Sequence, residues 1–134
     1  MKIGILTHHF IANFGAFLQA YALQECLKRE FPNDEVYVIN YIHLKHCIVN
    51  NGGWFRYYWG RENFSAWWQK IHLPFTFYKA RKTYLNMTKR CYDANDVNEL
   101  GLDVIVVGSD EVWNYSDSKS DAKIKFGDGL TCKN

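Results

Sequence analysis

The chain has 134 residues, a size typical of one globular domain, and its 48% hydrophobic and 22% charged residues argue against intrinsic disorder. Its formal net charge of +2 is too small to indicate a nucleic-acid partner. The N-terminus has no signal-peptide pattern, and no apolar run reaches the roughly 20 residues of a membrane-spanning helix, so we expect a cytoplasmic protein with reduced thiols.

The cysteines do not form a metal-binding pattern. Cys26, Cys47, Cys91 and Cys132 are far apart and lack the Cys-x-x-Cys or Cys/His spacing of zinc sites. We expect no metal and predict that Cys26 is a small core residue on the buried face of the first helix.

The first forty residues have the pattern of a β-α-β unit. Residues 2–6 form a short apolar run typical of a buried parallel strand, and residues 7–14 form a loop. Over residues 15–31 a helix is predicted from apolar positions at helical spacing, namely Leu18, Ala22, Leu23, Cys26 and Leu27. A second strand follows over residues 36–41, and the crossover predicts a right-handed parallel pair. The glycine-bearing helix start after a strand is typical of a site for an anion or polar ligand.

An aromatic-rich insertion is predicted at about residues 42–73. Its eight Trp, Phe and Tyr residues between Trp54 and Trp68 are mixed with Arg56, Arg61 and Lys70. Such a mixture is compatible with a peripheral membrane contact, with a protein–protein contact, or with a helical insertion that packs its aromatic side chains inside the protein.

The rest of the chain predicts one further helix and one further strand. Pro74 is suited to the first turn of a helix that places Phe77, Tyr84 and Cys91 on one face. Residues 102–107 form a β-branched run that predicts a central buried strand, followed by a turn from Gly108. Three strands are few for a doubly wound sheet, so we expect the sheet to be incomplete and its exposed edge to favour self-association.

Two motifs resemble the polysaccharide pyruvyl transferase family. Residues 13–23 read N-F-G-A-F-L-Q-A-Y-A-L and are similar to the start of a family helix, and residues 103–114 read D-V-I-V-V-G-S-D-E-V-W-N and are similar to a family strand ending in G-S-D-Q-V-W. The family's usual Gln is Glu111 here. The two motifs occur in the same order and spacing as in the family.

The resemblance implies a fold and an activity. It implies a three-layer, Rossmann-like α/β domain with a parallel sheet, the N-terminal portion of a two-lobed fold similar to glycosyltransferases. Residues 1–134 are then a truncated, partial domain without the second lobe. Family members transfer a pyruvyl group from phosphoenolpyruvate to a sugar of a cell-surface or exopolysaccharide. The implied donor is therefore phosphoenolpyruvate without a further cofactor, and the implied partner is a sugar or lipid-linked glycan acceptor at the inner face of the membrane.

The candidate site lies at the carboxyl ends of the strands, where open α/β sheets bind their ligands. After the first strand we expect Asn13, Gly15 and the Ala16 backbone to contact a polar sugar or phosphate, with Gln19 one turn further along; the alternative is a simple helix cap. His8 and His9 are adjacent and should point in opposite directions, so that one can face the cleft as an acid or base; the alternative is a pair of solvated loop histidines.

A second group of candidates follows the last strand. Ser109 and Asp110 are candidate sugar-binding residues, and Asp110 could equally act as a general base or cap the following turn. Trp113 could stack on a sugar ring or pack inside the protein.

Three classes of function fit these features. The first is the acceptor-side lobe of a pyruvyl transferase, with donor-binding Arg and His groups expected in the second lobe and no activity from this chain alone. The second is a non-catalytic remnant or interaction module of the same fold. The third, a small flavodoxin-like or nucleotide-binding domain, is disfavoured because the chain has neither a G-x-G-x-x-G motif nor a P-loop.

Overall fold

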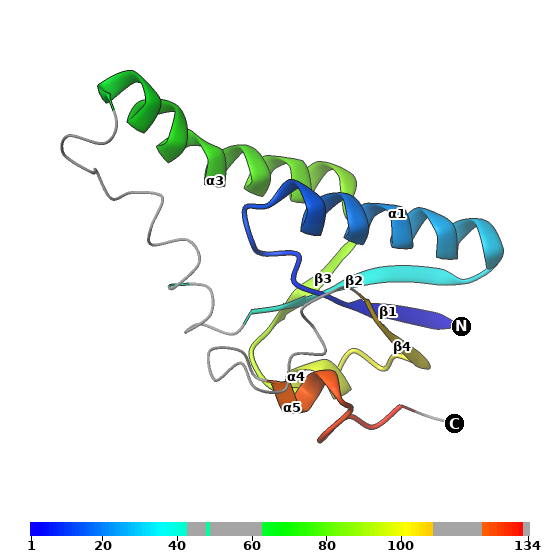
Figure 1. Ribbon diagram of the computed structural model, residues 1–134. Helices are drawn as coiled ribbons and strands as arrows, with labels where there is room; N and C mark the ends of the chain where they lie inside the picture. Colours follow the sequence, from blue (N-terminus) through cyan, green and yellow to red (C-terminus); the bar gives the residue numbers. More distant parts are fainter. Residues whose placement is uncertain (43–47, 49–62, 109–121, 133–134) are drawn as a thin grey trace.

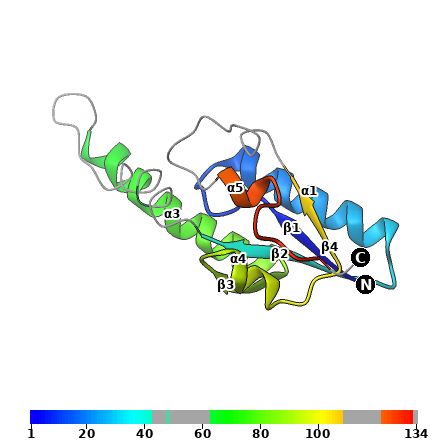
Figure 2. The same ribbon diagram turned by 90° about the horizontal axis from the view of Figure 1, so that it is seen from below.

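The computed structural model describes residues 1–42, 48, 63–108 and 122–132. In these ranges the main elements are β1 (Lys2–Leu6), α1 (Phe14–Glu30), β2 (Glu35–Tyr41), α3 (Phe64–Tyr84), β3 (Met87–Cys91), α4 (Ala94–Asn98), β4 (Val104–Val107) and α5 (Ala122–Lys125). The strands form one parallel sheet in the order β3-β2-β1-β4. Figures 1 and 2 show α1 and α3 on one face of this sheet and α4 and α5 on the other. The three-layer, Rossmann-like α/β class is therefore confirmed.

The alternation of side chains along the strands divides the core in two. On the α1 and α3 face, the buried cluster consists of Ile3, Ile5, Ala20, Val36, Val38 and Leu85. On the opposite face it consists of Leu6, Ile39, Tyr41, Cys91, Val97, Leu102 and Ile124. Gly4 of β1 lies on this second face, and a Cβ there would come within 2.5 Å of Leu102 Cδ1 and 2.9 Å of Ile39 Cδ1. A glycine at this position therefore allows Leu102 to cover the sheet.

Helix α1 packs on the sheet with a face that includes Leu23 and Leu27 of the predicted one but not Leu18, Ala22 or Cys26. Ala20 and Gln24 are its buried residues, and Leu23 and Leu27 pack beside them. Cys26 is exposed, so the prediction that it is a core residue was wrong. Apolar residues surround much of this helix, so periodicity alone fitted more than one face, and the position of the sheet decides which face is buried.

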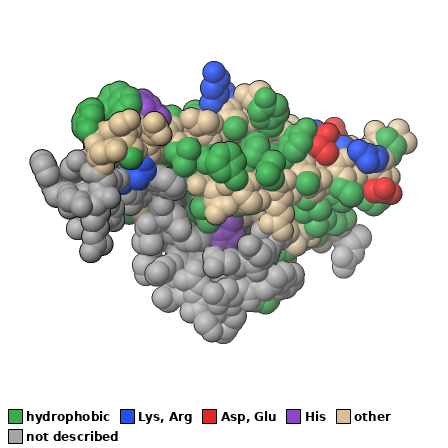
Figure 3. Space-filling view, turned by 45° about the horizontal axis from the view of Figure 1, so that its top comes forward, with side chains coloured by type: hydrophobic (Ala, Val, Ile, Leu, Met, Phe, Trp, Pro, Cys, Tyr) green, Lys and Arg blue, Asp and Glu red, His purple; other side chains and the backbone are tan. Residues whose placement is uncertain are grey.

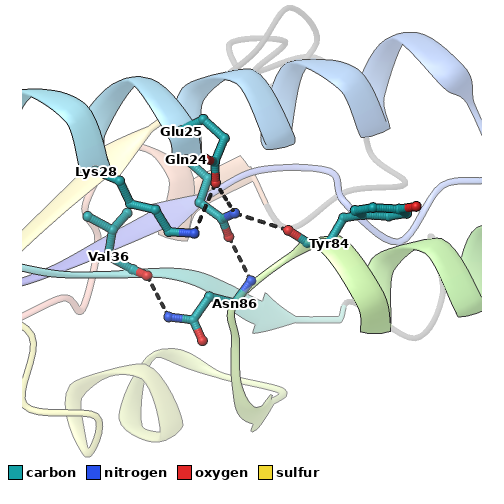
Figure 4. A network of polar contacts seen from close by, with 6 residues as sticks. All are labelled: Gln24, Glu25, Lys28, Val36, Tyr84 and Asn86. Atoms are coloured by element: carbon teal, nitrogen blue, oxygen red, sulfur yellow. Dashed lines mark hydrogen bonds and ion pairs between the residues drawn. The ribbon is translucent and has the colours of Figure 1, made fainter.

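Gln24 joins α1 to two other elements, as Figure 4 shows. Its side chain is completely buried; Nε2 donates to the Tyr84 carbonyl at 3.1 Å, and Oε1 accepts from the Asn86 backbone N–H at 2.6 Å. The Asn86 side chain in turn donates to the Val36 carbonyl at 2.8 Å. These bonds hold the end of α3 against α1 and direct the chain into β3.

The predicted helix that starts at Pro74 was wrong at both ends. Helix α3 begins earlier, because the Asn63 side chain accepts from the Ala66 N–H and caps it, and Pro74 lies inside the helix. The helix ends at Tyr84, and Met87–Cys91 is a strand that pairs with β2. Lys89 and Arg90 are exposed on this edge strand, which explains why no apolar run marked it in the sequence.

Strand β4 was predicted as a central buried strand and instead forms an edge of the described sheet. It pairs with β1 on one side, and Val104 is 41% exposed. The sheet therefore has four described strands rather than the predicted three. β2 and β3 lie on one side of β1, and β4 pairs with β1 on its other side.

Candidate functional site

The strand order creates a switch point between β1 and β4. The chain leaves β1 towards α1 on one face, whereas it arrives at β4 from α4 on the other face. Leu6 pairs with Val107, and the Gly108 N–H donates to the Leu6 carbonyl at 3.0 Å, so the segments after both strands begin side by side. Ligands of open α/β sheets bind in the crevice at such a point.

Gly108 directly follows β4 and is the last described residue of this segment. It lies under α1, where a residue with a Cβ would meet the helix. It is buried, and a Cβ at this position would lie 2.7 Å from Leu23 Cδ2. The following candidates, Ser109, Asp110 and Trp113, lie outside the described residues, as does Glu111. The structure thus places the start of their segment at the switch point.

His8 and His9 point to opposite sides of the sheet, as their adjacency predicted. His8 is buried, and its Nε2 accepts a hydrogen bond from the Lys125 ammonium group of α5. His9 lies on the other side, where its Nε2 is 3.2 Å from Asn40 Oδ1 and its carbonyl accepts from Arg81 Nη1 of α3 at 3.3 Å. Neither ring is a solvated loop histidine.

Burial lowers the pKa of His9 to about 4, although hydrogen bonds with the Thr7 carbonyl and Asn40 act in the opposite direction. The ring is 1% exposed, and Arg81 adds an unfavourable positive charge nearby. His9 is therefore neutral near neutral pH and is poorly suited to donate a proton there. It serves instead as a hydrogen-bonded link between the loop after β1 and the end of β2.

Asn13 forms the N-cap of α1. Its Oδ1 accepts from the Gly15 N–H at 2.7 Å and from the Ala16 N–H at 3.3 Å. Gly15 has no positive φ, and a Cβ added to it would lie 3.1 Å from Asn13 Oδ1, so its small size accommodates the cap. Gln19 is exposed one turn further along. The helix-cap interpretation is therefore realised, and two N–H groups at the helix start already have a protein partner.

A pocket of about 530 Å³ lies between α3 and the sheet, next to His9. Polar and charged residues contribute much of its lining, namely His9, Asn40, Tyr78, Arg81, Lys82 and Arg90. Sequence reasoning missed all of these except His9. Arg81 and Arg90 are nine residues apart in the sequence and come together only because the helix ends at Tyr84 and β3 turns back beside β2.

Neither a metal-binding cluster nor a membrane-spanning helix is present among the described residues. No group of three or more His, Cys, Asp or Glu side chains there could hold a metal ion. No helix in those ranges has the length and hydrophobicity needed to cross a bilayer.

A family model, polysaccharide pyruvyl transferase, matches residues 13–129. The chain belongs to the polysaccharide pyruvyl transferase family. The match starts at the residue that caps α1 and runs through the whole described sheet after β1. Neither the curated proteins nor the solved structures contain a significant match to this chain. The family resemblance drawn from the two sequence motifs is thus confirmed for this pyruvyl transferase-like chain.

Proposed function

We propose that this chain forms the N-terminal, acceptor-side lobe of an enzyme that transfers a pyruvyl group from phosphoenolpyruvate to a sugar of a cell-surface or exopolysaccharide. The observation that carries the proposal is the family match over residues 13–129. The switch point at the carboxyl ends of β1 and β4 supports it, because the strand of the second family-like motif ends there beside the end of β1.

The chemistry defines what the enzyme must supply. Formation of a cyclic ketal requires protonation of the enol double bond, addition of two sugar hydroxyls to the same carbon, and departure of phosphate with the C–O bonding electrons. Cationic groups and a general acid assist these steps. We propose that a second lobe supplies these donor-side groups, since neutral His9 is a poor proton donor.

The proposed acceptor contacts follow from the cap geometry. Asn13 Oδ1 is engaged with the N–H groups of Gly15 and Ala16, so its amide NH₂ is the group we expect to donate to a sugar hydroxyl. Gln19 extends this polar surface along α1. His8, held by its hydrogen bond with Lys125, is proposed to add a further polar group to this acceptor surface. Ser109, Asp110 and Trp113 are proposed to complete the wall of the acceptor site.

A chimera tests the proposal. Residues 13–129 of this chain would replace the matching segment of an active family member, and phosphate release from phosphoenolpyruvate and ketal formation on the sugar would be measured. We expect acceptor-dependent transfer by the chimera and none by residues 1–134 alone. A folded chimera that binds phosphoenolpyruvate but transfers nothing would favour the alternative, a non-catalytic remnant or interaction module.

We propose that this lobe works in the cytoplasm at the inner face of the membrane, where a lipid-linked glycan would be presented. Phe64 and Trp68, the described exposed aromatics at the start of α3, are 66% and 51% exposed and would contact the lipid surface. Binding to anionic vesicles should fall when both are replaced by serine. Equal vesicle binding by the double variant would remove the support for this contact.

We further propose that the chain self-associates through exposed apolar surface. Figure 3 shows hydrophobic side chains along the face that carries α1 and α3, and Phe14, Leu18 and Phe75 there are more than half exposed. Together with the β4 edge of the described sheet, this surface should make sedimentation concentration-dependent. A monomer at every concentration would contradict the proposal.

A further inference from the structure

The pocket under α3 has the size and position of a ligand site. Its volume of about 530 Å³ falls within the roughly 300–1,000 Å³ typical of small-molecule pockets. His9 and Asn40 form its inner end, where β1 and β2 finish, and Tyr78 and Arg81 belong to the helix that covers it. The pocket therefore lies at the same edge of the sheet as the proposed acceptor crevice.

The charged side chains among the described lining residues are all positive. They belong to Arg81, Lys82 and Arg90, and no Asp or Glu is among the lining residues in the described part of the chain. Arg81 is half-buried and is fixed by the bond from its Nη1 to the His9 carbonyl. Since the whole chain has a net charge of only +2, three cationic side chains around one pocket are a local concentration of charge. Guanidinium groups are well suited to bind carboxylate and phosphate oxygens.

The remaining wall suits a ring rather than a bare anion. Tyr78 and Pro74 from α3 and Phe10 from the loop after β1 present aromatic and apolar surface, and Asn40 and His9 add polar groups at one end. Such surfaces pack against the C–H face of a sugar, while the polar groups contact its hydroxyls. Phosphoenolpyruvate carries two anionic groups on a very small skeleton and would leave most of this wall uncovered.

We propose that this pocket binds an anionic sugar, with Arg81, Lys82 and Arg90 holding its carboxylate or phosphate and Tyr78 packing on its ring. The inference rests on the proposed acceptor role and adds to it a substrate class, an acceptor that carries an acidic group. A uronic acid and a sugar phosphate share this chemistry, and binding measurements distinguish them.

The first experiment titrates residues 1–134 with five probes at one ionic strength, followed by calorimetry or by backbone amide shifts. The probes are glucuronate, glucose 1-phosphate, glucose, inorganic phosphate and phosphoenolpyruvate. We expect one or both anionic sugars to bind about tenfold or more tightly than the other three. Tight binding of glucose 1-phosphate alone would identify the acidic group as a phosphate, and tight binding of glucuronate alone would identify it as a carboxylate.

Variants test the assigned cations. Lys82→Gln and Arg90→Gln should each weaken binding of the preferred sugar about five- to tenfold, since each removes one charge from the lining. Lys79→Gln is the matched control, because Lys79 is exposed on the same helix but does not line the pocket. Arg81→Lys keeps the charge and tests the forked geometry of the guanidinium.

Several results would overturn the inference. They are equal affinity for glucose, tighter binding of phosphoenolpyruvate than of either anionic sugar, or an equal loss in Lys79→Gln and Lys82→Gln. The chimera separates this inference from the proposed function. If the chimera transfers nothing while the pocket variants lose sugar binding, the proposed transferase role is wrong and the proposed sugar pocket is supported. If the chimera is active but the pocket binds no anionic sugar, the transferase role is supported and the sugar pocket is wrong.

Discussion

The buried histidine of the β1 loop makes the fold sensitive to mild acid. His9 is 1% exposed, and burial lowers its folded-state pKa to about 4 from an ordinary value of 6.5. The unfolded chain therefore binds a proton at this residue over a pH range in which the folded chain does not. Stability rises with pH wherever the unfolded state binds more protons than the folded state. The contribution of His9 is therefore complete above about pH 6.5 and is lost as the pH falls towards 4.

The size of the effect follows from the two pKa values. At about pH 5 the unfolded ring is mostly protonated and the folded ring mostly neutral, which favours unfolding by roughly thirtyfold relative to pH 7.5, or about 2 kcal/mol. This is a large fraction of the stability of a small domain. The loss should be visible as a lower denaturation midpoint in urea with little change in slope.

The assay compares urea unfolding at about pH 7.5 and pH 5 for the natural chain and for His9→Gln. Carboxylates also begin to titrate near the lower pH, so the informative quantity is the difference between the two proteins. We expect His9→Gln to lose about 2 kcal/mol less than the natural chain on acidification. His72→Gln, at an exposed histidine of α3, is the control and should behave like the natural chain.

A second measurement is independent of how well the variant folds. The ring resonances of His9 in the natural chain should show no titration above about pH 5. Identical pH slopes in the natural chain and His9→Gln, or a His9 ring that titrates near 6.5, would refute the reasoning.

Three further predictions concern stability, each measured by urea unfolding at neutral pH. Asn13→Ala removes the α1 cap and should cost about 1 kcal/mol, whereas Asn13→Asp should retain most of it; equal losses would show that the cap is unimportant. Gln24→Leu leaves the Tyr84 carbonyl and the Asn86 N–H without their partner and should cost about 2–4 kcal/mol. Lys28→Ala, which removes only the exposed Lys28–Glu25 ion pair on the same helix, should cost roughly a few tenths of a kcal/mol, so similar losses in both variants would contradict this. Gly4→Ala forces a Cβ into two core side chains and should cost about 1–3 kcal/mol, so an unchanged midpoint would mean that the core adjusts freely.

The sequence was sufficient for the elements whose stability is local. β1, β2 and β4 are apolar runs, and the start of α1 is marked by a residue that caps it, so their existence and order could be predicted. β3 could not, because Lys89 and Arg90 face solvent on an edge strand and the strand is held by its pairing with β2. Pro74 was misleading for a related reason: the Asn63 cap begins α3 ten residues before it.

The candidate site likewise has features that the sequence predicts and features that it does not. The opposite orientations of His8 and His9 follow from a two-residue period, which is a local rule, and the cap at Asn13 follows from residue type. The pocket under α3 depends on where a long helix lies relative to β2 and β3. Periodicity contains no information on that placement, and an error in one element, β3, was enough to hide Arg90 from the prediction.

His9 connects these two parts of the site. Its ring meets Asn40 at the end of β2, and its backbone carbonyl accepts from Arg81 on α3, so the loop after β1, the inner end of the pocket and one of the pocket's cations form a single bonded unit. A proton on His9 would place a second positive charge near Arg81. A bound acidic sugar would offset that charge. Ligand binding should therefore raise the pKa of His9 and reduce the loss of stability in acid, which ties the pH dependence of folding to occupancy of the pocket.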